Sequence, residues 1–319
     1  MNAILLVKTS SLGDVVHNLP VASDLGAAFP GTRIDWVVEE AFAAIPRAHH
    51  AIRNVLPVAV RRWRRAAWRR SVLEEMRGFV RALRLSRYDA VIDTQGLLKS
   101  ALIARAACGK RYGLDWASSR EPLGVFYTRS FSVPWSQHAV QRNRSLAAQA
   151  LHYTPAPPVD YGIRAPKLQF SWLPRQRYAV LIHSTSATRK LWPEARWREL
   201  GRALADRGFM CALPWGSPTE RERSDRLARA VPDAIVPPAL PLDQIMALLG
   251  GAQAVVGVDT GLTHLAAALG VATVGIYCAT DSARTGVYGA ARGVNVGGAG
   301  AMPEVGEVEQ ALHRLDTAL

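Results

Sequence analysis

The sequence has no run of about 18 consecutive apolar residues, the length that a helix needs to cross a bilayer. Its three cysteines, Cys108, Cys211 and Cys278, lie far apart. That spacing excludes a cysteine zinc site and the framework of a disulfide-rich secreted domain. The N-terminus shows no signal-peptide pattern. These absences favour a globular protein with reduced thiols in the cytosol.

Several motifs of nucleotide and metal chemistry are also missing. There is no G-x-x-x-x-G-K-[ST] phosphate loop and no G-x-G-x-x-G after a strand, so neither a P-loop NTPase nor an NAD-binding protein is expected. No Asp-x-Asp pair is present to bridge a diphosphate through a metal ion, and the histidines lack H-E-x-x-H spacing. We therefore predict neither a metal site nor a cofactor.

Positive charge is abundant and unevenly distributed. Lysine and arginine number 39 against 26 aspartate and glutamate residues, a net charge of +13. Residues 1–165 hold 23 basic and 12 acidic residues, a balance of +11, whereas residues 166–319 hold 16 and 14, a balance of +2. The first half is therefore expected to bind an anionic partner.

Apolar runs of strand length alternate with segments of helical periodicity in both halves of the chain. A proline-rich stretch between the halves, 155–174, predicts a semi-rigid linker. The alternation predicts an α/β protein with two doubly wound, Rossmann-like domains, 1–165 and 166–319, that face a central cleft. Strands are expected at 3–7, 33–38, 54–60, 88–93, 110–114, 178–184, 209–213, 234–236, 254–258 and 273–277. Helices are expected at 15–29, 71–86, 97–107, 193–207, 217–230, 241–250, 261–269 and 303–317, with a glycine-rich loop at 289–300.

The first strand leads into a loop of small polar residues that contains a single carboxylate, Asp14. Because a helix is expected to follow, Asp14 lies at a strand-to-helix junction, where open α/β sheets bind ligands. A carboxylate at that place can be a helix cap, a metal ligand or a catalytic base, and the loop by itself does not choose between them.

Two segments of the second half are compatible with phosphate. In the first, a strand ends at Asp259 and is followed by Thr260, Gly261 and His264, so the free N–H groups of the next helix can hold phosphate oxygens. The alternative is that Asp259 or Thr260 only caps the helix. An aspartic-protease reading of Asp-Thr-Gly fails, because it needs a second such carboxylate and a mostly β chain.

The second phosphate-compatible segment is the loop 183–193, which offers Thr185, Ser186 and Lys190 before a proline-initiated helix. The alternative is an ordinary polar loop, but two such loops in one domain indicate a nucleotide. After the next strand, Trp215 and Glu220 could contact a base and a ribose, or simply form a turn with a helix cap.

Residues 61–70 contain six arginines and two tryptophans, and include Arg61, Arg62 and Arg64. Arginine binds carboxylate and phosphate in bidentate fashion, and tryptophan favours the membrane interface. We prefer an anionic lipid or a sugar acid as the ligand; nucleic acid and a solvated helix face are the alternatives. Lys99, after a third strand-to-loop junction, and Arg120 could join these arginines around an acidic acceptor, or be ordinary surface charges.

Taken together, these motifs resemble the ADP-heptose–lipopolysaccharide heptosyltransferases, in order and over essentially the whole chain. The matching stretches are KTSSLGDVVHNLP (8–20), DWVVEE (35–40), IPRAHHAIRNVLPVAVRRWR (45–64), YDAVIDTQGLLKS (88–100), REPL (120–123), HSTSATRKLWP (183–193), LPWGSP (213–218) and VDTGLTHLAAAL (258–269).

The resemblance implies a GT-B glycosyltransferase with an acceptor-binding domain at 1–165 and a donor-binding domain at 166–319. A last helix, about 303–319, could pack back on the first domain. The resemblance further implies metal-independent, inverting transfer of L-glycero-D-manno-heptose from ADP-heptose to the first Kdo sugar of Kdo2–lipid A, in lipopolysaccharide core synthesis. It implies a peripheral position on the cytoplasmic face of the inner membrane and no binding of nucleic acid. The alternatives are a heptosyltransferase that adds a later heptose and, more remotely, a non-catalytic nucleic-acid-binding protein.

The resemblance also implies roles for single residues. Asp14 falls on the catalytic base and Lys190 on the lysine that neutralises the departing diphosphate. Donor-binding positions are Thr185, Ser186, Lys190, Trp215, Glu220, Leu240, Asp259, Thr260, Gly261 and His264. Acceptor-binding positions are Arg61, Arg62, Arg64, Lys99 and Arg120.

Overall fold

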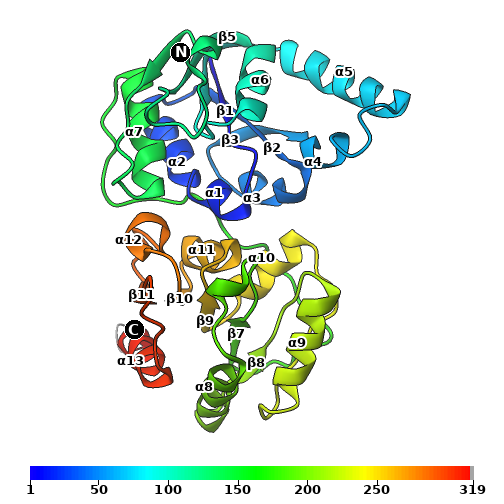
Figure 1. Ribbon diagram of the computed structural model, residues 1–319, viewed down its shortest axis with the longest axis vertical. Helices are drawn as coiled ribbons and strands as arrows, with labels where there is room; N and C mark the ends of the chain where they lie inside the picture. The colour runs from blue at the N-terminus through cyan, green and yellow to red at the C-terminus, as the bar shows by residue number, and fades with distance from the viewer. Residues whose placement is uncertain (317–319) are drawn as a thin grey trace. The chain divides into compact units, whose positions relative to one another are not determined.

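The computed structural model describes residues 1–316 and divides the chain into two α/β units (Figure 1). The first unit is Met1–Ile163 and the second begins at Arg164. The boundary lies inside the proline-rich stretch expected to be a linker, close to the expected division after residue 165. Each unit contains a single sheet in which all the strands are parallel.

The sheet of the first unit has the strand order β3-β2-β1-β4-β5-β6. Its central strand, β1, is the apolar run at the N-terminus, and all five of its residues are buried, as expected for a parallel strand covered on both faces. The strands are β1 Ala3–Val7, β2 Arg33–Glu39, β3 Ile52–Val58, β4 Arg87–Asp93, β5 Cys108–Leu114 and β6 Arg129–Phe131. The helices are α1 Leu12–Val16, α2 Leu19–Ala28, α3 Ala44–Arg47, α4 Val60–Trp63, α5 Arg70–Arg84, α6 Leu98–Ala106 and α7 Ala139–Leu151.

The sheet of the second unit has the order β11-β10-β9-β7-β8. Its strands are β7 Tyr178–Ile182, β8 Met210–Ala212, β9 Ala254–Val258, β10 Ala272–Tyr277 and β11 Gly293–Gly297. Its helices are α8 Glu194–Asp206, α9 Pro218–Ala228, α10 Leu242–Gly250, α11 Gly261–Ala268, α12 Ser282–Thr285 and α13 Val305–Asp316. Short 3₁₀ segments, one of them η3 Thr188–Lys190, complete the list.

The direction of winding reverses once in each sheet, and these two switch points position the candidate site. In the first unit the reversal lies between β1 and β4, and in the second between β7 and β9. Ligands of open α/β sheets bind outside the carboxyl ends of the strands at such points. Lys190 and Asp259 lie in the loops that follow β7 and β9, and Asp14 and Lys99 lie in the first turns of α1 and α6, directly after the loops that follow β1 and β4.

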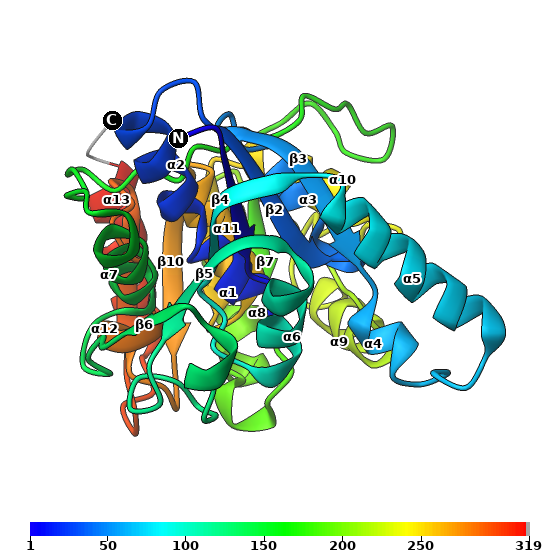
Figure 2. The same ribbon diagram turned by 90° about the horizontal axis from the view of Figure 1, so that it is seen from above.

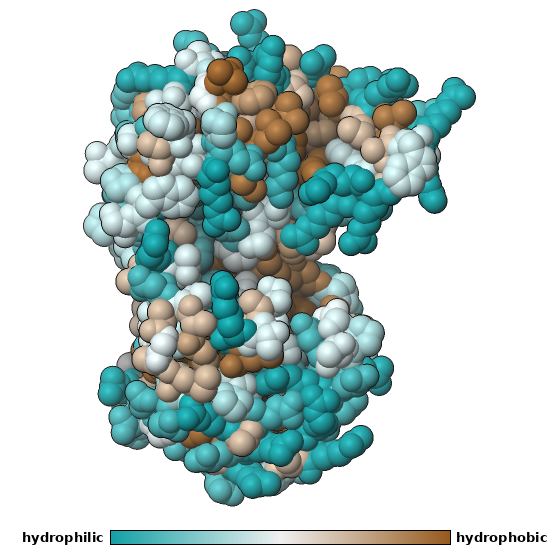
Figure 3. All heavy atoms as spheres, viewed as in Figure 1, coloured by the Kyte–Doolittle hydropathy of each residue, from teal (hydrophilic) through white to brown (hydrophobic). Residues whose placement is uncertain are grey.

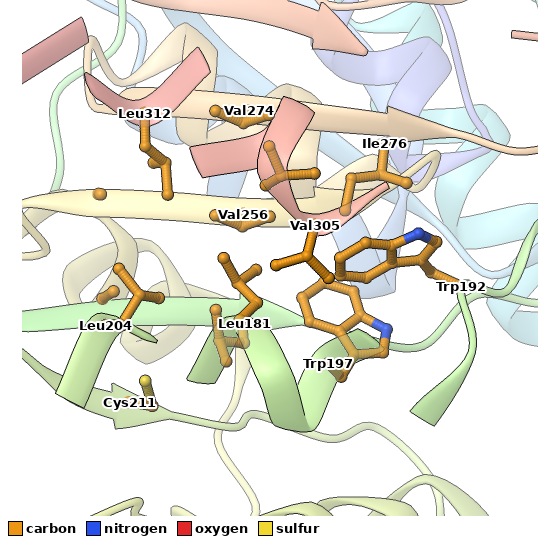
Figure 4. Close-up of a cluster of buried hydrophobic side chains, with 14 of the residues drawn as sticks. Leu181, Trp192, Trp197, Leu204, Cys211, Val256, Val274, Ile276, Val305 and Leu312 are labelled. Carbon is orange, nitrogen blue, oxygen red and sulfur yellow. The ribbon is translucent and has the colours of Figure 1, made fainter. Parts of the chain in front are cut away.

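The last helix belongs to the core of the second unit. Val305, Val308, Ala311, Leu312 and Leu315 of α13 are buried in the same apolar cluster as the strands of that sheet. Figure 4 shows Val305 and Leu312 directed toward the side chains of the neighbouring strands. The apolar face of this helix is thus covered by its own sheet, and the expectation that the helix also packs back on the first unit stays a prediction. Residues 317–319 of that expected helix lie outside the described residues.

Other expectations differ from the structure, and strand β6 was not expected. The helix expected at 15–29 is two helices, because Pro20 occupies the first turn of a new helix, α2. Residues 234–236 form a single bridge, Ala212 to Ile235, instead of a strand. The loop expected at 289–300 contains the edge strand β11, and α7 was not expected at all.

Candidate active site

Two loops of the first unit are tied together beside the carboxyl ends of β1 and β4. The side-chain oxygen of Gln95 accepts hydrogen bonds from the backbone N–H groups of Thr9 (3.0 Å) and Ser10 (3.1 Å). The Nζ of Lys99 donates to the hydroxyl of Ser10 at 2.6 Å. Lys99 is thereby held against the loop that carries Asp14.

Asp14 is half-buried and uses one of its two carboxylate oxygens within the loop. Its Oδ2 accepts from the backbone N–H (2.8 Å) and the hydroxyl (2.9 Å) of Ser11. Asp14 therefore helps to cap α1, which is one of the three roles considered for this carboxylate. Within residues 1–316 no protein group is recorded against Oδ1, so this oxygen can accept a proton from a ligand hydroxyl.

Other cations surround Lys99 and Asp14. Burial, together with the charges of Arg61 and Arg64, lowers the pKa of Lys99, while Glu39 and Asp14 oppose the shift. Burial also lowers the pKa of Lys8, which lies in the same loop. Asp14 and Asp93 oppose that shift and Arg120 adds to it. Arg61, Arg64 and Arg120 thus lie within electrostatic range of this loop, as their predicted acceptor role requires.

Arg62 is already engaged by two carboxylates of its own unit. Its guanidinium contacts Glu40 at 3.1 Å and Glu75 at 2.6 Å. The run 61–70 contains no acidic residue, and both glutamates come from segments outside it. Of the predicted acceptor residues, Arg62 is therefore the one that would have to exchange partners to bind a ligand.

A compact cluster around Asp259 lies at the switch point of the second unit. The Nζ of Lys190 contacts Oδ2 of Asp259 at 2.8 Å, and the hydroxyl of Thr280 donates to the same oxygen at 2.6 Å. His264 Nε2 lies 3.5 Å from Oδ1. The hydroxyl of Thr185 donates to the backbone oxygen of Asp259 at 3.1 Å. The loops after β7 and β9, which are far apart in sequence, therefore meet in one cluster, and its role as the donor site stays a prediction.

The charge of Asp259 is fixed by these contacts. Burial favours its neutral form, but the bonds from His264, Lys190 and Thr280 outweigh burial and hold the pKa of Asp259 well below its usual range. An ionised Asp259 keeps the Lys190 ammonium in place at the loop surface. The Lys190 side chain is about a quarter exposed, so an incoming diphosphate can reach it.

The start of α11 provides further donors beside this cluster. Thr260 is the extended N-cap residue of α11 and makes no side-chain cap bond. The N–H groups of Thr263 and His264 donate to the backbone oxygen of Thr260, whereas among the described residues no partner is recorded for the N–H groups of Gly261 and Leu262. Gly257 makes the close packing of this helix possible, because a Cβ there would collide with the Thr263 hydroxyl, which donates to the Val258 oxygen at 2.7 Å. A helix start with open N–H groups beside a lysine suits a phosphate. Ser186 is exposed on the adjoining loop.

Trp215 and Glu220 lie at a second place in the same unit, at the start of α9. The indole N–H of Trp215 donates to the backbone oxygen of Pro237 at 2.8 Å, which ties the turn before α9 to the segment that contains half-buried Leu240. Glu220 accepts from the Gly216 N–H at 2.7 Å and so takes part in the cap of α9. One oxygen of Glu220 therefore has the capping role that we considered, and the predicted base and ribose contacts stay predictions.

Sequence reasoning missed Thr280 and Gln95. Thr280 closes the Asp259 cluster and Gln95 organises the Asp14 loop. Both follow the carboxyl end of a strand next to a switch point, and that position is the signal that could have identified them. Within residues 1–316, no group of three or more His, Cys, Asp or Glu side chains is arranged to hold a metal ion.

His183, at the start of the 183–193 loop, makes stability depend on pH. Its ring nitrogens bond to the hydroxyls of Ser224 (2.9 Å) and Ser184 (2.8 Å), and burial, with the charge of Arg223, lowers its pKa to about 3. At a pH below 6.5, the ordinary pKa of histidine, His183 is protonated in the unfolded chain but stays neutral in the folded protein. The free energy of unfolding should therefore fall by about 1.4 kcal/mol per pH unit from this group as the pH drops below 6.5.

Urea unfolding between pH 7 and pH 5 measures this slope. The His183→Asn variant should show a shallower decline than the unsubstituted protein, and equal slopes would contradict the assignment.

The fold agrees with that of solved glycosyltransferases. The structure of E. coli heptosyltransferase WaaC with ADP superposes with a TM-score of 0.89 at 42% identity and covers 98% of this chain and 99% of that one. The structure of the same enzyme with ADP-2-deoxy-2-fluoro heptose gives a TM-score of 0.85 at 41% identity, again over 98% and 99%. Two all-parallel α/β units with this likeness define the class: the protein is a glycosyltransferase of the GT-B fold.

Sequence comparison identifies the family within this class. The model of the family described as glycosyltransferase family 9 (heptosyltransferase) matches residues 76–314. Lipopolysaccharide heptosyltransferase 1 of Pseudomonas aeruginosa is 50% identical over 290 residues, which are 90% of this chain and 81% of that protein. The chain belongs to glycosyltransferase family 9, the heptosyltransferases. Its role is heptosyl transfer in the synthesis of the lipopolysaccharide core.

Proposed function

We propose that the protein transfers L-glycero-D-manno-heptose from ADP-heptose to the first Kdo sugar of Kdo2–lipid A, with inversion at the anomeric carbon and without a metal ion. The donor assignment is supported by the likeness to the E. coli enzyme solved with ADP and with a fluorinated ADP-heptose. The observation that carries it is the Lys190–Asp259–Thr280 cluster beside the start of α11, which offers one partly exposed cation and the N–H groups of Gly261 and Leu262 to a diphosphate.

The reaction follows from the charges at the two loops. Asp14 Oδ1 accepts the proton of the Kdo hydroxyl, whose oxygen then attacks the anomeric carbon of the heptose. The bond from that carbon to the diphosphate oxygen breaks, and the electron pair leaves with ADP. Lys190 and the N–H groups at Gly261 stabilise the negative charge that develops on the leaving oxygen.

The acceptor assignment is supported by the charge of the first unit. The balance of +11 over residues 1–165 suits the carboxylates of Kdo and the phosphates of lipid A, and Lys99, Arg61, Arg64 and Arg120 lie around the Asp14 loop. We further propose that the protein works at the cytoplasmic face of the inner membrane, where such an acceptor is embedded. No helix among the described residues is long and apolar enough to cross a bilayer.

A transfer assay with identification of the product tests this proposal. ADP-heptose is offered with delipidated Kdo2–lipid A and, separately, with the same acceptor already carrying one heptose, each with and without EDTA. We expect the Kdo acceptor to be the better substrate by a wide margin and EDTA to have no effect. Preference for the heptosylated acceptor would indicate an enzyme that adds a later heptose. Loss of activity in EDTA, restored by a divalent cation, would contradict the metal-free mechanism.

A further inference from the structure

The first unit contains an apolar groove that the transfer chemistry does not use. The groove has a volume of about 660 Å³ and lies between α5, the end of α4 and α6. Its floor includes Trp63 and Phe79, whose rings meet edge to face with centroids 5.8 Å apart. Met76, Leu98 and Leu102 line the groove as well.

The lining residues are exposed to an unusual degree for their size. Leu102 is 53% exposed, Leu98 47% and Met76 37%. Of the 15 residues of α5 only Val72 and Leu83 are buried, and Leu73 and Met76 of this helix are 40% and 37% exposed. Figure 2 shows α5 and the turn before it projecting from the rest of the first unit, and Figure 3 shows apolar side chains gathered near α5 and α6 between hydrophilic ones.

The groove is bordered by a dense array of arginines. Residues 61–84 contain nine arginines and two glutamates. Both glutamates are satisfied locally, Glu75 by Arg62 and Glu74 by Arg70. Among the described residues no ion pair is recorded for the other arginines of this segment, which are Arg61, Arg64, Arg65, Arg69, Arg77, Arg81 and Arg84. Trp68, in the turn between α4 and α5, is 76% exposed.

We propose that this face, formed by α4, α5 and α6, docks the protein on the surface of an anionic phospholipid bilayer. An interfacial segment is expected to combine an apolar face, a polar face rich in arginine and an exposed tryptophan, and all three are present here. The arginines meet the anionic headgroups, while Met76, Leu98 and Leu102 enter the boundary of the acyl chains. Nucleic acid would neutralise the arginines but leaves the exposed aliphatic side chains unexplained.

The position of the groove connects this surface to catalysis. Lys99 and Arg64 line it together with the apolar residues, and Lys99 also holds the Asp14 loop through Ser10. On the proposed function, on which this inference rests, the acceptor is a bilayer lipid. A docking face beside the acceptor residues would bring the Kdo sugars to the base with the lipid still in its leaflet.

Vesicle co-sedimentation of the full-length protein tests the proposal. The vesicles are phosphatidylcholine alone, or phosphatidylcholine mixed with phosphatidylglycerol, and contain no lipid A. The groove variant is Met76→Ser with Leu102→Ser, and the charge variant is Arg77→Gln with Arg81→Gln. Their matched controls in the second unit are Leu168→Ser with Met302→Ser, which are 47% and 42% exposed, and exposed Arg175→Gln with Arg229→Gln.

We expect the protein to bind the anionic vesicles and not the neutral ones. The charge variant should bind about 25-fold more weakly, since each near-surface cation contributes about fivefold, and the groove variant about tenfold or more weakly. Both control pairs should stay within about twofold of the unsubstituted protein. Equal binding by the groove, charge and control variants would overturn the proposal. So would binding that requires lipid A in the vesicles, or a change of oligomeric state in the groove variant, which would indicate a second copy or another protein as the occupant.

Transfer to delipidated acceptor, measured on the same variants, separates this inference from the proposed function. The groove and charge variants should keep that activity, because none of their residues belongs to the proposed acceptor or donor sites. If the unsubstituted protein bound vesicles but did not transfer heptose to the Kdo acceptor, the proposed function would fail and the docking face would stand. If all variants kept both normal transfer and normal vesicle binding, the proposed function would be supported and the docking face would be contradicted.

Discussion

Replacement of Asp14 by asparagine should reduce heptosyl transfer by about 10²–10⁴-fold, the usual contribution of a general base, while ADP-heptose still binds. Asparagine keeps an oxygen that can accept the Ser11 N–H bond, now 2.8 Å from the carboxylate, so the cap of α1 survives. What the variant loses is the basic oxygen at Oδ1. Steady-state kinetics and calorimetric titration with ADP-heptose measure the two effects separately.

The matched control for Asp14 is Ser11→Ala. This variant removes the hydroxyl that donates to Asp14 at 2.9 Å but leaves the carboxylate, so transfer should stay within a few-fold of normal. Near-normal turnover of Asp14→Asn would make the base assignment wrong. If Asp14→Asn unfolded at a clearly lower temperature than Ser11→Ala, the carboxylate would matter mainly as a cap.

Replacement of Lys190 by alanine should lower the rate of transfer by about 10²–10³-fold, by analogy with the loss of one donor to a developing oxyanion. The physical reason is that Lys190 is the cation that Asp259 holds, at 2.8 Å, at the surface of the donor loop. Because the diphosphate gains charge as the bond breaks, the loss should appear in kcat and exceed the loss in donor affinity.

Arg189→Ala is the control for Lys190. Arg189 is an exposed cation one position away, and no ion pair with Asp259 is recorded for it. Its removal therefore tests whether any positive charge on this loop suffices or whether the Lys190–Asp259 contact is required. It should change the rate by no more than a few-fold. An effect of Lys190→Ala confined to the affinity for the acceptor, or an equal effect of Arg189→Ala, would contradict the leaving-group role.

Regular apolar patterns made most of the fold predictable. Strand β1 and strand β9 are short runs of buried aliphatic residues followed by polar loops, and the sequence predicted both within a residue. The parts that were missed have weak patterns. The strand β11 reads GVNVG, and glycine composition hides an edge strand that pairs on one side only.

Helix α7 was missed for a different reason. It buries Arg144, whose guanidinium pairs with Asp24 of α2 at 2.7 Å, and Asn143, which donates to the backbone oxygen of His17 at 3.2 Å. A helix that faces the core with polar side chains has no clear apolar period. Its contacts depend on residues more than 100 positions away, and local reasoning cannot supply them.

In the candidate site, too, the features that depend on local sequence were predictable and those that depend on distant contacts were not. The loops were found because polar residues follow apolar strands, and their residues do meet: Lys190, Thr185 and His264 all contact Asp259. Single partners were not predictable. Thr280 and the glutamates that engage Arg62 come from distant segments, and nothing in the local sequence of Arg62 distinguishes it from Arg61 or Arg64.

The anomeric configuration of the product tests the central claim most directly. A single displacement, with Asp14 removing the proton from the attacking hydroxyl and Lys190 stabilising the departing ADP, must invert the configuration of the heptose. NMR of the heptosylated Kdo acceptor, compared with the donor ADP-heptose, reports the outcome. The account predicts inversion, and a product that retains the donor configuration would contradict it.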